Sequence, residues 1–291
     1  MKNNIKSLVI LNVMKDLYQV PQLDFDILLA FSIGKPKEFL YIHPEYPISI
    51  IQYLRFRWFI NRYKKGYSVA AITKHKEFYG LDFYVNKNVL IPRPDTERLV
   101  ASATRIMNDE LRIKNDKVIL IDVGTGSGCI PISILKNLIE PITTYSTDIS
   151  RSALRVAKKN AVKHNVKINF LHGNLLEPLI HHSSFILPTS TLVVTANLPY
   201  LTEKQFRDEP SIQREPKHAL VADKNGLALY EELLQQIKSL FLIHHSSSLI
   251  LFEIDPSQTE EISKIIKQYL PNSTIEIKKD LSGLDRLIKI F

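Results

Sequence analysis

The residues with the clearest chemistry form a short stretch, Asn197-Leu198-Pro199-Tyr200, that directly follows the apolar run 191–196. Such a run is typical of a buried parallel strand, and open α/β sheets bind ligands at the carboxyl ends of their strands. An Asn side chain offers one acceptor and two donors, and Pro199 leaves the carbonyl before it free to face a ligand. The stretch can therefore hold a planar NH2 group by both hydrogens, beside an aromatic ring. This favours methylation of an amide or an exocyclic amine, although an Asn-Pro turn after a strand also explains the pattern.

A glycine-rich segment upstream has the composition of a ligand-binding loop. The apolar run 117–122 precedes it, and residues 129–135 after it have helical spacing. The loop consists of Gly124, Thr125, Gly126, Ser127 and Gly128. Its glycines allow tight turns and close approach to a ligand, and N–H groups at the helix start attract a polar tail. The spacing differs from dinucleotide and phosphate-binding loops, and it resembles the S-adenosylmethionine loop of class I methyltransferases.

Two further strand ends complete a cofactor site. Asp148 follows the predicted strand 141–147, some distance past the glycines, where a carboxylate can accept both hydroxyls of a ribose. Asn174 and Leu175 follow the predicted strand 167–172, where an adenine would lie with Asn174 near its amino edge. Together with Asn197, these strand ends supply contacts for methionine, ribose, adenine and acceptor. The sequence therefore predicts S-adenosylmethionine binding.

The composition is that of a globular chain with one large or two modest domains. The chain has 291 residues, of which 45% are hydrophobic and 23% are charged, enough to bury a sizeable core. Its net charge of +8 suits nucleic acid, ribosomal particles or an acidic protein partner, although lysine-rich surfaces are common without such a role. The single cysteine, Cys129, excludes an internal disulfide and a cysteine-based metal site, which fits a reducing cytosol.

Signals for membranes, secretion and metals are weak. No apolar run approaches the length that spans a bilayer, and no small-residue cleavage site follows the basic N-terminal stretch. The histidine pairs 181–182 and 244–245 lie in Ser-rich, loop-like stretches, where we expect no metal site. The sequence therefore predicts a cytoplasmic protein that neither spans a membrane nor holds a metal.

The first part of the chain has the pattern of a small helical bundle. Helices are expected over 24–33, which Gly34 closes, and over 37–43 and 48–64. The aromatic residues of the third helix recur on one side, as in a bundle core. We therefore assign residues 1–66 to an N-terminal helical domain.

A linker and a larger domain follow. Weak alternation over 69–74 and 81–85 predicts a β-hairpin, so that residues 67–90 form a linker. The stretch 89–97 contains two prolines before a helix start, and it can form a lid over the cofactor or serve as a rigid linker. The larger, catalytic domain would then cover residues 91–291.

Strands and helices alternate through this larger domain, which predicts an α/β fold. Besides the four strands already given or implied, strands are expected at 248–253, 273–278 and 286–290, the last two as an antiparallel pair. Residues 201–224 form a long polar stretch, and a structureless loop of that length inside a compact domain is usually functional. The prediction is a seven-stranded sheet with ligand contacts at its carboxyl edge.

With these segments in order, the chain resembles the bacterial protein-(glutamine-N5) methyltransferases of the HemK/PrmC family, which modify peptide-chain release factors. The resemblance covers nearly the full length, and the stretch 89–97 is its most specific part. The matching motifs are 26–30 with Gly34, His43-Pro44, 79–85, 89–97, 122–128, 148–150, 197–200, Glu215-Pro216 with Ala219-Leu220, Gly226-Leu227, Glu253-Ile254 with Gln258, and 280–286.

The resemblance implies a class I, Rossmann-like methyltransferase domain with a small N-terminal helical domain that grips the protein substrate. It implies transfer of a methyl group from S-adenosylmethionine to the glutamine of a Gly-Gly-Gln motif in release factors. Asn197 and the Leu198 carbonyl would accept the two amide hydrogens, Pro199 would fix the turn, and Tyr200 would pack on the glutamine. A monomer without a stable nucleic-acid complex is expected.

Two departures from the family pattern keep alternatives open. The family usually has proline at the position of Leu198 and often has aspartate at that of Asn174. Asn-Leu-Pro-Tyr also resembles the motif of adenine-N6 rRNA dimethyltransferases, so methylation of adenine in nucleic acid is one alternative. The others are glutamine methylation of a ribosomal protein, which the stretch 89–97 disfavours, and a cofactor-binding scaffold without catalysis, which intact Asp148 and Asn197 disfavour.

Overall fold

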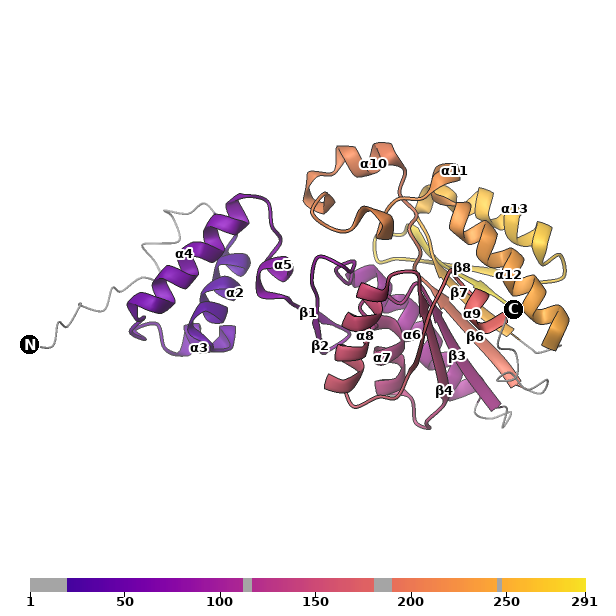
Figure 1. Cartoon of the computed structure of the whole chain (residues 1–291), viewed down its shortest axis with the longest axis horizontal. Helices are drawn as coiled ribbons and strands as arrows, with labels where there is room; N and C mark the ends of the chain where they lie inside the picture. The colour runs from indigo at the N-terminus through magenta and orange to yellow at the C-terminus, as the bar shows by residue number, and fades with distance from the viewer. Residues whose placement is uncertain (1–19, 112–116, 181–189, 245–247) are drawn as a thin grey trace, which may run out of the picture. The chain divides into compact units, whose positions relative to one another are not determined.

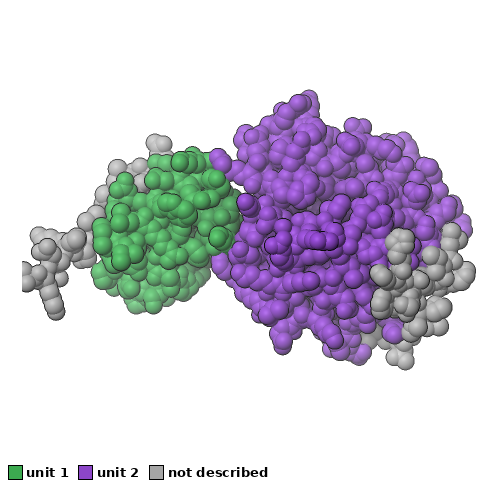
Figure 2. Space-filling model, in the orientation of Figure 1, with its two compact units in different colours: residues 1–74 green, residues 75–291 purple. Residues whose placement is uncertain are grey.

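The computed structural model describes residues 20–111, 117–180, 190–244 and 248–291. The chain divides into two compact units, residues 1–74 and residues 75–291 (Figure 2). Each unit has its own buried apolar core, and each is described by itself below.

The smaller unit is helical, as the sequence predicts. Its helices are α2 (Gln22–Ile33), α3 (Lys37–Ile42), α4 (Ile50–Lys64) and α5 (Val69–Thr73). Gly34 ends α2 in the left-handed conformation, with φ 71°, and its N–H is bonded to carbonyls of the last turn. The packing of α2 on α4 centres on Phe25 and Phe56, whose rings meet edge to face with centroids 5.1 Å apart. The three helices predicted for this part of the chain are therefore confirmed.

The predicted strand 69–74 is wrong, because most of it forms the short helix α5. The Ser68 hydroxyl caps this helix by accepting the Ala71 N–H at 3.2 Å, and Lys74 ends it with φ 61°. Weak alternation of apolar and polar residues suggested a strand, whereas the serine cap favours a helix here. Apolar Ile72 packs into the helical core of the smaller unit.

The predicted hairpin exists, but its first strand lies further along the chain. It consists of β1 (His75–Phe78) and β2 (Leu81–Tyr84), paired antiparallel. The two turn residues, Tyr79 and Gly80, both have positive φ values, 51° and 70°, which suits the right-handed twist of a two-residue hairpin. The hairpin belongs to the larger unit, whereas the sequence placed it in a separate linker over 67–90.

The larger unit is built on the predicted seven-stranded sheet. The strand order is β5-β4-β3-β6-β7-β9-β8. Strands β3 to β7 run parallel, and β9 pairs antiparallel with both of its neighbours, β7 and β8. The strands are β3 (Lys117–Val123), β4 (Thr143–Asp148), β5 (Asn169–His172), β6 (Ser190–Ala196), β7 (Ser248–Glu253), β8 (Ile275–Lys279) and β9 (Asp285–Ile290).

Helices cover both faces of this sheet (Figure 1). One face packs against α6 (Glu97–Ile106), α7 (Cys129–Asn137) and α8 (Arg151–Lys163), and the other against α9 (Glu177–Ile180), α12 (Ala228–His244) and α13 (Thr259–Tyr269). Side chains of the central strand β3 alternate between the two layers, since Ile119 and Ile121 enter one core and Leu120 the other. Short helical turns η1 (Pro94–Thr96), η2 (Met107–Leu111) and η6 (Pro256–Gln258) adjoin α6 and α13.

The order of the strands places the site. From β3 the chain builds outward through β4 and β5, and then returns to add β6 on the other side of β3. The carboxyl ends of β3 and β6 are in register, with Val123 opposite Ala196. The glycine loop and Asn197 therefore emerge side by side where the strand order reverses, which is the usual ligand position in such sheets.

Asn160 fastens the hairpin to the glycine loop. This fully buried residue of α8 donates through Nδ2 to the carbonyls of Tyr84 and Ser127, both at 2.9 Å. Its Oδ1 accepts the Tyr84 N–H at 2.9 Å. The same side chain thus satisfies backbone groups from β2 and from the loop, which fixes one relative to the other.

The polar stretch 201–224 has more structure than a loop. It contains α10 (Glu203–Asp208), η4 (Pro210–Ile212), η5 (Lys217–Ala219) and the start of α11 (Asp223–Gly226). Its ends are joined, because the Leu201 N–H donates to Leu220 at 2.9 Å and Leu201 accepts the Ala222 N–H at 3.0 Å. The expectation of a structureless loop is therefore wrong; local caps such as Thr202 on α10 supply the missing order.

Candidate active site

A cavity of about 290 Å³ opens at the carboxyl edge of the sheet, where the strand order reverses. Its walls come from the segment before α6, the ends of β3 to β6, and the stretch 201–224. The lining residues are Asn88, Val89, Leu90, Pro92, Arg93, Thr96, Gly124, Thr125, Gly126, Ser127, Cys129, Ile130, Asp148, Ile149, Ala153, Asn174, Leu175, Asn197, Leu198, Pro199, His218, Ala219 and Leu229. The structure thus brings together all the predicted site residues except Gly128 and Tyr200.

The glycine loop has the backbone conformation that only glycine adopts easily. Gly124, Gly126 and Gly128 have φ values of 70°, 56° and 79°. A Cβ atom on Gly124 would lie 3.0 Å from a methyl group of Leu198, so the loop and the β6 end pack closely. Gly128 is the N-cap residue of α7 and does not line the cavity, and a Cβ there would meet Ile132 at 3.0 Å.

Asp148 holds the glycine loop from the end of β4. One carboxylate oxygen accepts the Gly126 N–H at 2.9 Å, and the other accepts the Ser150 N–H at 2.7 Å. Burial raises the pKa of Asp148, and the two N–H groups, then His218, offset part of that rise. Each oxygen keeps a further lone pair for a ligand, so the predicted ribose contact is compatible with both bonds.

Asn174 and Leu175 follow β5 on the far side of the cavity. The Asn174 amide nitrogen donates one of its two hydrogens to a carboxylate oxygen of Glu232 at 2.5 Å, and its amide oxygen can accept a hydrogen bond from a ligand. Leu175 has a φ of 46° and a buried side chain. An amide oxygen and an apolar surface suit the amino edge and the ring of an adenine.

Asn197 is held by both hydrogens of its side-chain amide. Its Nδ2 donates to the Thr96 hydroxyl at 3.0 Å and to a carboxylate oxygen of Glu253 at 2.9 Å. A primary amide has two donor hydrogens, so both are used inside the protein. The Asn197 oxygen is therefore the part of the side chain that can serve an acceptor substrate.

The backbone at Leu198 is fixed by Tyr230. The Leu198 N–H donates to the Tyr230 hydroxyl at 3.2 Å, and that hydroxyl donates in turn to the backbone carbonyl of Glu253. Pro199 restricts the conformation of Leu198 from the other side. Leu198, the departure from the family pattern, has a buried side chain that packs under Gly124.

Tyr200 lies beside the cavity and does not line it. Its hydroxyl is 3.5 Å from a carboxylate oxygen of Glu253, and its carbonyl accepts the amide of Gln258 at 2.9 Å. The same Gln258 amide donates to the Asn225 carbonyl at 2.8 Å. A Cβ on Gly226 would lie 1.9 Å from the Tyr200 oxygen, so only glycine fits there. The role predicted for Tyr200, packing on the acceptor, stays a prediction.

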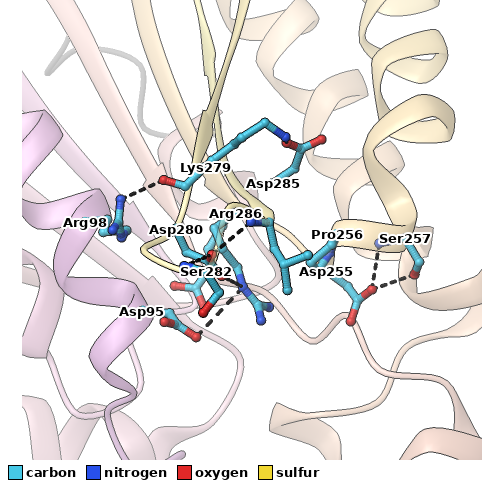
Figure 3. Close-up of polar contacts among 12 residues, drawn as sticks. Asp95, Arg98, Asp255, Pro256, Ser257, Lys279, Asp280, Ser282, Asp285 and Arg286 are labelled. Atoms are coloured by element: carbon cyan, nitrogen blue, oxygen red, sulfur yellow. Dashed lines mark hydrogen bonds and ion pairs between the residues drawn. The ribbon is translucent and has the colours of Figure 1, made fainter.

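A charged cluster surrounds this corner of the site. Arg286 of β9 lies 3.1 Å from Asp280 and 3.8 Å from Asp95, between the last hairpin and the start of α6 (Figure 3). Asp95 directly precedes Thr96, so the ion pair helps to hold the Thr96 hydroxyl near Asn197. Both acidic partners lie in motifs that carry the family resemblance.

The segment before α6 is tied to the stretch 201–224. Glu215 forms an ion pair with Arg93 and accepts the Ile91 N–H at 2.9 Å. The Glu215 side chain is only 8% exposed, so its carboxylate is largely protected from solvent in both contacts. Both segments line the cavity, which is compatible with the predicted lid.

Sequence reasoning missed four residues that hold the site together. Thr96, Glu253 and Gln258 were visible only as members of family motifs, and no role was assigned to them. Tyr230 carried no signal, because an aromatic residue in an amphipathic helix is usually a core residue. All four act on the segment 197–200 through contacts between elements far apart in the sequence.

The cavity fits S-adenosylmethionine in its chemistry. A glycine cradle with positive φ values faces it beside a carboxylate, an amide oxygen and apolar side chains.

In the described part of the chain, no three acidic, histidine or cysteine side chains are placed to hold a metal ion. His181, His182 and His245 of the histidine pairs lie outside the described residues. Within the described ranges, no helix is long and apolar enough to cross a membrane.

We expect Asp148→Asn to weaken S-adenosylmethionine binding at least about tenfold, because one acceptor oxygen is replaced by a donor. Calorimetric titration measures the affinity, and Asp208→Asn, at an exposed position on α10, is the matched control. Unchanged affinity in a folded Asp148→Asn protein would contradict the ribose assignment. A purely structural role would lower the melting temperature and leave the affinity of the folded protein intact.

Two protein families match parts of the chain. Residues 14–73 match the family described as PrmC N-terminal domain, and residues 97–188 match the one described as Methyltransferase small domain. Among solved structures, the hMettl16 catalytic domain in complex with MAT2A 3'UTR hairpin 6 has a TM-score of 0.52 at 15% identity, covering 76% of this chain and 79% of that one. That likeness shows the fold, a class I methyltransferase sheet, as the sequence predicts.

Similar sequences cover nearly the whole chain. A release factor glutamine methyltransferase of Staphylococcus aureus is 34% identical over 251 residues, which is 86% of this chain and 84% of that protein. One of Bacillus subtilis is 32% identical over 266 residues, or 90% and 88% of the two chains, and one of Bacillus anthracis is 30% identical over 266 residues, 90% of each. With the site at the switch point of its sheet and these relatives along its length, the chain belongs to the release factor glutamine methyltransferase family.

Proposed function

We propose that this protein transfers the methyl group of S-adenosylmethionine to the side-chain nitrogen of the glutamine in the Gly-Gly-Gln motif of peptide-chain release factors. Membership of the family supports the substrate, since the relatives carry that activity in their names. The single observation that supports the chemistry best is the Asn197 amide. Both of its hydrogens are bonded inside the protein, so its oxygen is left to receive a hydrogen from a planar NH2 group.

Two acceptors beside each other suit a glutamine amide. The Asn197 oxygen would accept one hydrogen of the substrate NH2 group, and the Leu198 carbonyl would accept the other. An amide nitrogen is a weak nucleophile, because its lone pair is delocalised into the carbonyl. Two fixed acceptors orient this nitrogen and stabilise the positive charge that grows on it.

S-Adenosylmethionine, when bound, supplies an electrophilic methyl group on sulfur. The segment 197–200 and the glycine loop emerge from neighbouring strands, so the nitrogen and the cofactor would be held on one edge of the sheet. The methylated nitrogen still carries both hydrogens and a positive charge, which makes it strongly acidic. It can lose one proton to solvent after transfer, so the reaction needs no strong base.

Adenine-N6 methylation is the nearest alternative, because adenine also presents a planar NH2 group. The site's two acceptors do not distinguish the two groups. The family and the names of the relatives favour glutamine, and they give no support to a ribosomal protein or a non-catalytic scaffold.

We expect Asn197→Ala to reduce the methylation rate of a release factor by roughly 10²–10³, with a smaller effect on cofactor affinity, because the lost contact strengthens in the transition state. Asn272→Ala, at an exposed position before β8, is the control. Peptide mapping by mass spectrometry locates the methyl group. A methylated adenine in rRNA, with an unmodified Gly-Gly-Gln peptide under the same conditions, would overturn the proposal.

We also propose that the N-terminal helical unit grips the protein substrate. It is a compact unit of its own, and every residue that lines the cavity lies beyond residue 87. Helix α4 exposes Ile51, Leu54 and Trp58 at helical spacing, and each is more than half exposed. Exposed apolar side chains of this kind are common at protein-binding surfaces.

We further infer that the protein is a cytoplasmic monomer that forms no stable complex with nucleic acid.

A chain that starts at His75 should retain cofactor affinity and lose most of its activity on an intact release factor. The reason is that the cavity is complete within residues 75–291, whereas the proposed grip is removed. Calorimetry and methylation rates on the same preparation measure the two effects. Wild-type activity of the shortened chain on the intact substrate would show that residues 1–74 are dispensable for recognition.

A further inference from the structure

We propose that Glu253 is a positioning residue whose carboxylate, with the Thr96 hydroxyl, holds the Asn197 amide so that its oxygen faces the acceptor substrate. The inference deepens the proposed function and rests on it, because the acceptor is the glutamine NH2 group named above. Glu253 ends β7, Thr96 ends η1, and Asn197 follows β6. Three separate elements therefore converge on one amide.

The geometry of this group is closed. Glu253 Oε2 accepts one Asn197 hydrogen at 2.9 Å, and the Thr96 oxygen accepts the other at 3.0 Å. The Thr96 hydroxyl also lowers the pKa of Glu253. Thr96 and Glu253 are 2% and 3% exposed, so water competes little for these bonds.

The reverse orientation of the amide is disfavoured by charge. If the Asn197 side chain were turned over, its oxygen would face the Glu253 carboxylate, which has only lone pairs to offer. Its two hydrogens would then face the substrate NH2 group, donor against donor. A carboxylate at this position therefore selects the one orientation that suits the reaction.

The backbone of the same residue supports the second acceptor. The Glu253 carbonyl accepts the hydrogen of the Tyr230 hydroxyl, and the Tyr230 oxygen accepts the Leu198 N–H at 3.2 Å. The orientation of the Leu198 peptide is thus set from Glu253 as well. One residue at the end of β7 supports both groups that would receive the substrate hydrogens.

The surroundings of the Glu253 carboxylate are mixed in charge. Burial raises the pKa of Glu253 to about 7, and Asp95 of η1 adds to the rise. The Thr96 hydroxyl, Arg286 of β9 and the Tyr200 hydroxyl lower this pKa. Tyr230 of α12 faces the same residue and is itself held neutral by burial, which raises its pKa. The carboxylate is therefore ionised above neutral pH and protonated below it.

Three variants test the assignment: Glu253→Gln, Asn197→Asp and the two combined. A glutamine side chain at position 253 has both a donor and an acceptor, so it no longer selects one orientation of the Asn197 amide. We therefore expect kcat for the release factor to fall about tenfold in Glu253→Gln. KM and cofactor affinity should stay within about threefold of wild type. Asn197→Asp places two carboxylates in contact and should lose about 10²–10³ in kcat near pH 8.5. Glu261→Gln, an exposed position on α13, is the control and should leave kcat unchanged.

The double variant is the decisive one. In it, the amide introduced at position 253 can donate to one oxygen of the carboxylate introduced at position 197, so the other oxygen faces the substrate and the acceptor is restored. We expect kcat at least about tenfold higher than in Asn197→Asp alone, a coupling that independent residues do not show. Additive losses in the double variant would overturn the assignment. If the wild type itself placed no methyl on Gly-Gly-Gln, the proposed function would fail instead. Hydrogen exchange of the Asn197 amide, described next, would still decide whether Glu253 positions that amide.

The second measurement follows the Asn197 amide directly. In protein labelled with 15N-asparagine, the side-chain NH2 signals that Asn197→Asp removes should exchange slowly with solvent and shift as pH crosses about 7, the pKa of Glu253. In Glu253→Gln, exchange should be at least about tenfold faster and that pH step should disappear, whereas Glu261→Gln should match the wild type. Asp122, buried under the glycine loop and with a pKa raised to about 7, is present in all of these proteins, so the comparison isolates Glu253. Identical exchange and an unchanged pH step in Glu253→Gln would refute the proposal.

Discussion

The site depends on which end of one amide faces the substrate. An asparagine amide is nearly symmetric in shape, but one end donates two hydrogen bonds and the other accepts them. In this protein both donors of Asn197 are bonded to Thr96 and Glu253, so the oxygen is left over. The chemistry proposed for the site follows from that constraint, since a substrate NH2 group needs acceptors on two sides.

The constraint explains why a carboxylate is buried at the end of a sheet strand. Burying a charge is unfavourable, and this cost of desolvation is why the pKa of Glu253 is raised. Hydrogen bonds from Asn197 and Tyr200, the Thr96 hydroxyl and the nearby charge of Arg286 compensate for part of this cost. The antiparallel strand β9 pairs with β7, so the last hairpin brings Arg286 beside Glu253. The end of the chain therefore contributes to the site although it does not line the cavity.

Much of the site could be predicted, because it lies at strand ends that follow one another in the sequence. Gly124, Asp148, Asn174 and Asn197 each lie at or just after the end of a predicted strand, and the reversal of strand order gathers them. Short capped helices were harder to predict: the Ser68 cap begins α5 where weak alternation suggested a strand, and the Thr202 cap begins α10 where a polar stretch suggested a loop. Glu253 could not be assigned, because its partner Thr96 lies on a different element and nothing local links the two. Periodicity describes which face of an element is buried, but it does not say which buried polar groups meet.

The most direct measurement is a crystal structure of the protein with S-adenosylhomocysteine and a peptide containing Gly-Gly-Gln. We expect the glutamine side-chain nitrogen to lie within about 3 Å of both the Asn197 oxygen and the Leu198 carbonyl oxygen. The Asn197 nitrogen should remain bonded to Glu253 and Thr96. A glutamine amide bound elsewhere in the cavity, or an Asn197 side chain that donates its hydrogens to the peptide, would contradict the account.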